Sequence, residues 1–133
     1  MNRVPLIDRN ATSVERKQTL DAIHAAFGAT PAMFRAVANS PAALNSMWGS
    51  FAALGGGAIG ARLGEQIAVA IANRNACNYC LAAHTALGMK AGMSAEVMAA
   101  AQAGESSEPK TRAALQFALK LVEQRGQVEA ADV

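Results

Sequence analysis

The sequence lacks any apolar stretch long enough to cross a membrane. Spanning a bilayer takes about 20 consecutive apolar residues, whereas the longest apolar run near the middle of the chain extends only from Ile67 to Ala72. The first ten residues also lack the apolar core of a secretory signal peptide, because Arg3, Asp8 and Arg9 interrupt their few apolar side chains. We therefore predict a soluble, cytoplasmic protein with no membrane partner.

Charged and aromatic residues are also scarce. Of the 133 residues, 17% are charged and 5% are aromatic, and the net charge is +2. The charges form no basic stripe and the aromatic residues form no ladder, so we expect no nucleic-acid partner. Hydrophobic residues make up 52% of the chain, which is more than in an average soluble domain. Some of this apolar surface is expected to meet another subunit.

Strand patterns are absent, whereas helix signals recur along the whole chain, so the predicted fold class is all-α. Thr30 and Ser40 each precede a proline, which is a typical helix start. The expected helices are Val14–Phe27, two short segments from Pro31 and Pro41, and then 61–73, 77–89, 95–103 and 109–122. A chain of 133 residues can bury one core. We predict a single domain over residues 1–133.

A literal G-x-G-x-x-G stands at Gly55, Gly57 and Gly60. This dinucleotide fingerprint works only where a strand turns into a helix. The preceding segment, 48–54, has a helical pattern. We therefore interpret the glycines as a connection between two helices and not as a nucleotide site.

The segment from Glu65 to His84 contains the residues with the clearest chemistry. It has the pattern E-x11-C-x2-C-x3-H, with the cysteines at Cys77 and Cys80. Two cysteines three residues apart at a helix start can close a disulfide, and the helix N-terminus favours a thiolate there. His84 lies four residues after Cys80, so a helix places both on one face. Its imidazole can take or return a thiol proton.

Glu65 reaches this group only if the chain reverses. On a continuous helix it would lie about 18 Å from Cys77 along the axis. The polar run Asn73-Arg74-Asn75 breaks the apolar stretch and offers a turn. The midpoint between Glu65 and His84 falls at this turn, so an antiparallel helical hairpin brings carboxylate and imidazole to the same level. Glu65 is then expected to orient His84 or to accept its proton through water.

Two other interpretations of the cysteines remain open at this stage. Thiolates, imidazole and carboxylate are also ligands for zinc, and free cysteines are often simply buried as small hydrophobic residues. Zinc cysteines usually lie on loops rather than within a helical turn, so we expect neither a metal nor another cofactor.

Together with Tyr79 and the later Gly-Met-Ser at 92–94, these four residues resemble the alkylhydroperoxidase D-like (AhpD-like) branch of the carboxymuconolactone decarboxylase superfamily. The likeness extends to segments 40–44 and 114–126 and so covers most of the chain. The resemblance implies an all-helical homo-oligomer, trimeric or hexameric, that reduces hydroperoxides through its Cys-x-x-Cys pair. It also implies a thiol or lipoyl-bearing protein as the reductant.

The resemblance further implies a role for each residue. Cys80 would be the peroxidatic thiolate, Cys77 the resolving thiol, and Glu65 with His84 the proton relay. Helix electrostatics alone would instead favour Cys77 as the nucleophile, because it lies nearer the helix start. Some family members carry a second histidine where this chain has Tyr79, and a phenol is a poor base at neutral pH. We therefore expect Tyr79 to pack beside the site, with a possible accessory hydrogen bond.

Two alternative functions share these residues. One is a protein disulfide reductase or redox-sensing module that does not turn over peroxide. The other is a lactone decarboxylase, which acts by proton transfer without a redox cycle. The dithiol favours a redox function over the decarboxylase.

Overall fold

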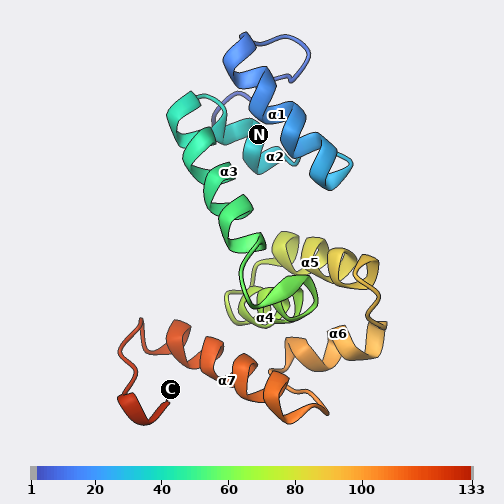
Figure 1. The fold of residues 1–133 in the computed structure, drawn as a ribbon, viewed down its shortest axis with the longest axis vertical. Coiled ribbons are helices and arrows are strands. Elements are labelled where there is room, and N and C mark those ends of the chain that lie inside the picture. Colours follow the sequence, from blue (N-terminus) through green and yellow to red (C-terminus); the bar gives the residue numbers. More distant parts are fainter. Residues whose placement is uncertain (1–2, 133) are drawn as a thin grey trace. The chain divides into compact units, whose positions relative to one another are not determined.

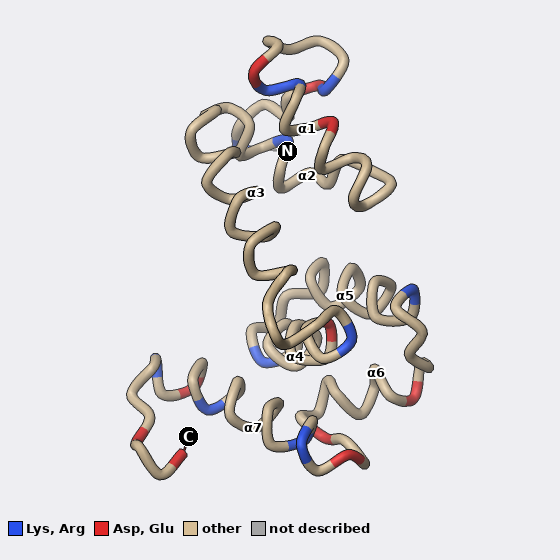
Figure 2. Tube along the Cα trace, viewed as in Figure 1, with Lys and Arg blue, Asp and Glu red and all other residues tan. Residues whose placement is uncertain are grey.

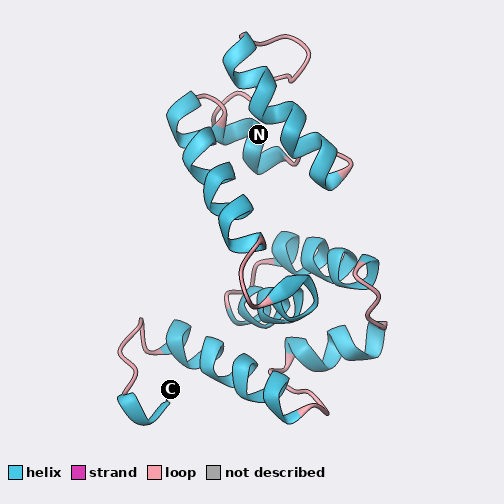
Figure 3. Cartoon of the chain, viewed as in Figure 1, coloured by secondary structure: helices cyan, strands magenta, loops and turns pink. Residues whose placement is uncertain are grey.

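The computed structural model describes residues 3–132 and confirms the all-α prediction (Figures 1 and 3). Within these residues the elements are α1 (Val14–Phe27), α2 (Ala32–Val37), α3 (Pro41–Gly55), α4 (Gly60–Arg74), α5 (Asn78–Lys90), α6 (Ala95–Gln102), α7 (Pro109–Glu123) and a 3₁₀ turn, η1 (Ala130–Asp132). The helix from Pro41 has 15 residues, so it is longer than expected, and it ends at the glycine cluster. Across residues 3–132, no helix is both long enough and apolar enough to cross a bilayer.

The glycine cluster is a helix connection, as expected. Among the described residues no strand precedes it, and α3 ends at Gly55 while α4 begins at Gly60. The structural setting of a dinucleotide fingerprint is therefore missing.

The chain divides into two compact units, Met1–Gly57 and Ala58–Val133. The single domain over residues 1–133 stays a prediction. The first unit contains α1, α2 and α3 around one apolar cluster. The fully buried side chains of this cluster are Leu20, Ile23, Phe34, Ala38 and Leu44. Trp48 packs edge-to-face on Phe34, with ring centroids 6.0 Å apart.

An ion-pair network holds α1 to the segment that precedes it. Asp21 accepts hydrogen bonds from Lys17 Nζ and Arg9 Nη1, both at 2.7 Å. The Lys17 bond, followed by the Arg9 bond, lowers the pKa of the Asp21 carboxyl below its ordinary value. The folded chain therefore favours the ionised form of Asp21.

The sign of this shift predicts how the first unit responds to acid. A lowered carboxyl pKa contributes stability above the unfolded pKa, and that contribution is lost as the pH falls below it. We expect the stability of the parent protein to exceed that of Asp21→Asn at pH 7, and the difference to shrink between pH 5 and pH 3. Urea unfolding followed by fluorescence of Trp48, the only tryptophan, measures it. Stability curves that stay parallel over this range would contradict the assignment.

The second unit is built around α4, which packs against α5, α6 and α7 (Figure 1). Its apolar cluster centres on Val69 and Ala70 of α4, with Met98 of α6 and Leu115 of α7. A helix with neighbours on several sides buries more than one face. This explains why the segment from Ile67 to Ala72 is apolar without interruption.

Candidate redox site

The site is built on the turn between α4 and α5. The Ala76 N–H donates to Asn73 O and the Cys77 N–H donates to Ala72 O, both at 3.0 Å. These two bonds form a Schellman motif, which satisfies the last carbonyls of α4. The chain thus reverses at Arg74 and Asn75, as the sequence predicted. In Figure 1 α4 is seen nearly end-on while α5 lies across the picture, so the axes of the two hairpin helices are steeply inclined to each other.

Ala76 is the residue of this turn that the sequence did not identify. Its φ is +52°, in the left-handed region that glycine usually occupies at this position of the motif. Alanine gives no sequence signal for such a conformation. The left-handed turn sets Cys77 directly at the N-cap of α5.

We predict that Ala76→Gly stabilises the protein by about 0.5–1 kcal/mol, because glycine removes the steric cost of the left-handed conformation. Ala82→Gly is the matched control, since Ala82 is exposed in the interior of α5. There glycine should destabilise by about 1 kcal/mol. Thermal unfolding by far-UV circular dichroism measures both. Changes of the same sign in the two variants would show that Ala76 carries no such cost.

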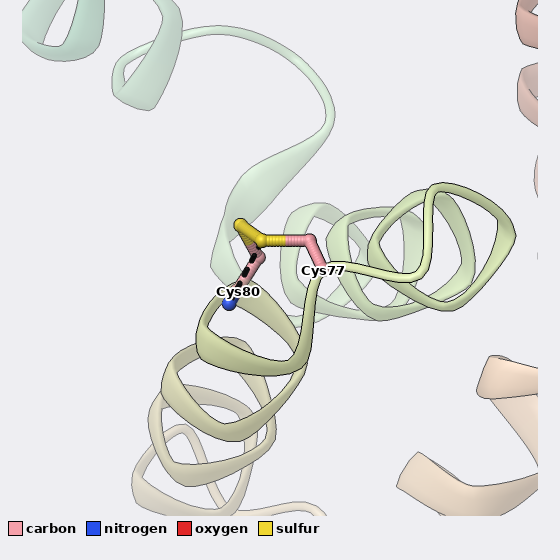
Figure 4. Close-up of a disulfide and its surroundings, with 2 residues drawn as sticks. All are labelled: Cys77 and Cys80. Atoms are coloured by element: carbon pink, nitrogen blue, oxygen red, sulfur yellow. Dashed lines mark hydrogen bonds between the residues drawn. A yellow bond between two sulfur atoms is a disulfide. The ribbon is translucent and has the colours of Figure 1, made fainter.

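Cys77 and Cys80 form a disulfide at the start of α5, with their Cα atoms 5.3 Å apart (Figure 4). Both residues are half-buried. The Cys80 N–H donates to Cys77 Sγ at 3.3 Å, so the Cys77 sulfur takes the place of an N-cap oxygen. In the reduced protein, this N–H and the helix dipole favour a thiolate at Cys77.

Glu65 and His84 meet across the hairpin, which confirms the geometric prediction. Their Oε2 and Nδ1 atoms are 2.8 Å apart, and the side chains are 22% and 34% exposed. An ionised carboxylate only accepts hydrogen bonds, so His84 Nδ1 carries the proton and donates. In the neutral imidazole this leaves Nε2 as the atom that can take a proton.

In the structure the four predicted residues form two contacting pairs, Cys77 with Cys80 and Glu65 with His84. His84 follows Cys80 by one turn of α5, on the same face of the helix. Within residues 3–132, no hydrogen bond links the imidazole of His84 to either sulfur. The dithiol and the carboxylate–imidazole pair are therefore separate contacts on one hairpin.

The side chain of Tyr79 is 60% exposed and makes no hydrogen bond within the described chain, so its packing beside the site stays a prediction. It lies between the two cysteines in the first turn of α5, where the side chains of Asn78 and Tyr79 point to solvent. A phenol exposed beside a disulfide is placed to meet a molecule that approaches the sulfurs.

Zinc binds cysteine as the thiolate, whereas the sulfurs of Cys77 and Cys80 form the disulfide in this structure. Over residues 3–132, no three His, Cys, Asp or Glu side chains come together in a group that could hold a metal ion.

Comparison with known proteins agrees with this architecture. The model of the carboxymuconolactone decarboxylase family matches residues 39–123, which include all four predicted residues. The chain is also similar to the crystal structure of the alkylhydroperoxidase AhpD core from Rhodospirillum rubrum ATCC 11170. That match has 28% identity and a TM-score of 0.69, and it covers 98% of this chain and 96% of that chain. No match was found among curated protein sequences.

Proposed function

We propose that this chain is a thiol peroxidase that reduces hydroperoxides. The premise is that it belongs to the carboxymuconolactone decarboxylase family and to its AhpD-like branch. The observation that carries this proposal is the disulfide between Cys77 and Cys80 at the N-terminus of α5. A pair that closes within one helical turn stores two electrons in its dithiol form. That is the number needed to reduce one hydroperoxide to an alcohol and water.

The proposed cycle has three steps. The Cys80 thiolate attacks the outer oxygen of the hydroperoxide, the O–O bond breaks, and the alcohol leaves with a proton while Cys80 becomes a sulfenic acid. The Cys77 thiol then attacks the Cys80 sulfur and releases water, which closes the disulfide. A dithiol reductant finally returns two electrons and two protons by thiol–disulfide exchange.

In this cycle His84 transfers the proton and Glu65 positions His84. Nε2 of His84 accepts the Cys80 proton and returns it to the alkoxide that leaves. Glu65 is a positioning residue, because its hydrogen bond to Nδ1 keeps Nε2 in the acceptor form. Both residues are partly shielded from solvent, which supports a defined geometry.

The assignment of roles to the two sulfurs rests on the family resemblance. The hydrogen bond from the Cys80 N–H to Cys77 Sγ instead supports Cys77 as the more acidic thiol. Both observations fit a site in which Cys80 reacts with peroxide and the Cys77 thiolate is ready to resolve the sulfenic acid. The variants Cys80→Ser and Cys77→Ser distinguish the two roles.

A single-turnover reaction tests the proposed function. Fully reduced protein is mixed anaerobically with cumene hydroperoxide, and the cumyl alcohol formed is measured by chromatography. We expect one alcohol molecule per subunit from the reduced protein and none from the disulfide form. Equal, slow alcohol formation from both forms would refute the peroxidase function.

A protein disulfide reductase is a second candidate, and the exposed Tyr79 beside the disulfide supports it. Such an enzyme would pass electrons to disulfides of other proteins without consuming peroxide. Rapid reduction of insulin by the reduced chain, without alcohol formation from hydroperoxide, would favour it.

The family match also supports a lactone decarboxylase as a candidate. This reaction needs a general acid or base and no redox change, so it would persist when both cysteines are replaced by serine. Release of CO₂ from a carboxylated lactone by the double variant would favour the decarboxylase.

We also infer a homo-oligomer, trimeric or hexameric, that works in the cytoplasm with a thiol or lipoyl-bearing reductant protein. Exposed apolar side chains support association between subunits: Leu54 is 79% and Ile59 is 58% exposed. Light scattering coupled to gel filtration tests the oligomer, and a monomer at micromolar concentration would count against it.

A further inference from the structure

A second group of polar side chains lies where α4 and α7 begin, within the unit Ala58–Val133. Two adjoining hollows, of about 390 and 610 Å³, share four of their lining residues, namely Arg62, Gln66, Glu108 and Thr111. Small-molecule sites are typically hollows of about 300–1,000 Å³. Gln66 and Thr111 are also the two buried polar residues of the described chain, at 8% exposure each.

The larger hollow has two positive groups from different helices. Arg62 lies in the first turn of α4 and Lys110 in the first turn of α7. Neither forms an ion pair within residues 3–132, whereas the nearby Arg112 lies 3.6 Å from Glu105. Neither helix start has a side-chain cap, so backbone N–H groups there add to the positive potential. Figure 2 shows charges of both signs gathered where α7 begins.

The same hollow also offers hydrogen-bond acceptors. Gln66 Nε2 donates to Met93 Sδ at 3.1 Å, while its Oε1 has no partner in the described chain. Glu108 accepts the Thr111 hydroxyl through Oε2, and its Oε1 has no partner there either. Both residues line the hollow, so their oxygens are available there to accept a hydrogen bond from a ligand.

The hollow is separate from the redox site although both use α4. Glu65 and Gln66 are neighbours in sequence, so their side chains point about 100° apart around the helix. Arg62 and Gln66 are four residues apart and share a face. Ile59 and Leu63 add apolar wall to the larger hollow.

We propose that this hollow binds a small hydroxy acid with an apolar body. Its carboxylate contacts Arg62 and Lys110, with Arg62 able to bind both carboxylate oxygens. Its hydroxyl donates to Gln66 Oε1 or Glu108 Oε1, and its apolar part lies on Ile59 and Leu63. This ligand site lies apart from the redox site, and the proposal does not depend on the peroxidase function.

Three probes that differ by one group each test the proposal by titration of the ¹⁵N-labelled protein, followed by amide chemical shifts. Mandelate has the acid and the hydroxyl, phenylacetate lacks the hydroxyl, and 1-phenyl-1,2-ethanediol lacks the acid. We expect saturable shifts at residues 60–63 and 110–112 with mandelate, binding about threefold to tenfold weaker with phenylacetate, and none with the diol.

Variants of the cations provide the second arm. Arg62→Gln and Lys110→Gln together should weaken mandelate binding about tenfold or more. Lys90→Gln, which changes a lysine at the end of α5 outside the hollow, should leave it unchanged. Preserved amide spectra show that the variants fold. Mandelate shifts that do not saturate, or equal affinity of the double variant and the parent, would overturn the proposal. Equal binding of phenylacetate and mandelate would show that the hydroxyl is not recognised.

Discussion

Cys80→Ser is expected to abolish the rapid reaction with hydroperoxide. If the Cys80 thiolate attacks the O–O bond, its loss removes the nucleophile, and the second-order rate constant should fall about a thousandfold or more. Stopped-flow mixing of the reduced variant with cumene hydroperoxide measures this rate. The serine hydroxyl keeps the size of the side chain, so the half-buried position stays filled.

Cys77→Ser is the matched control for this experiment. It keeps the proposed nucleophile and removes the thiol that resolves the sulfenic acid. The variant should consume one hydroperoxide per subunit at a rate near that of the parent, and Cys80 should then react with dimedone. Retained reactivity in Cys80→Ser together with its loss in Cys77→Ser would reverse the roles. In that case the hydrogen bond from the Cys80 N–H to Cys77 Sγ would mark the peroxidatic thiolate.

His84→Gln should slow peroxide reduction by about 10²- to 10⁴-fold, the usual contribution of a positioned acid or base. Glu65→Gln should cost less, about tenfold to a hundredfold, because it leaves the imidazole in place but lets either nitrogen carry the proton. The pH profile of the rate distinguishes a positioning role of Glu65 from an effect on the stability of the fold. Glu65→Gln should change the shape of the pH profile, which a loss of packing would not do.

Glu123→Gln is the control for the carboxylate. Glu123 pairs with Arg74 at 2.9 Å, and both side chains are about half exposed. An exposed pair contributes little to stability, and Glu123 itself lies at the end of α7, outside the hairpin of α4 and α5. Its loss should leave the rate and its pH profile unchanged. If Glu65→Gln has the same rate and pH profile as Glu123→Gln, Glu65 takes no part in the proton relay.

Much of the hairpin could be predicted because its determinants are local. The polar run at 73–75 ends an apolar helix, and the equal spacing of Glu65 and His84 from that turn fixes which residues meet. The expected helix 77–89 likewise agrees with α5, Asn78–Lys90, to within one residue at each end. These features depend on helix periodicity and turn chemistry, which can be read from the residues themselves.

Features that depend on tertiary packing gave no such signal. The left-handed conformation of Ala76 follows from how α4 and α5 must join, and alanine does not favour it. The exposure of Tyr79, which is 60% in the first turn of α5, likewise had no sequence signal. The hollow around Gln66 and Thr111 joins residues 45 positions apart, and no local pattern connects them.

The most direct test of the dithiol peroxidase is an anaerobic thiol titration. Reduced protein receives cumene hydroperoxide in amounts below one per subunit, and the free thiols are counted after each addition. We expect two thiols to disappear for each hydroperoxide, until neither of the two cysteines in the chain reacts. A thiol count that stays at two after a full equivalent of hydroperoxide would contradict it.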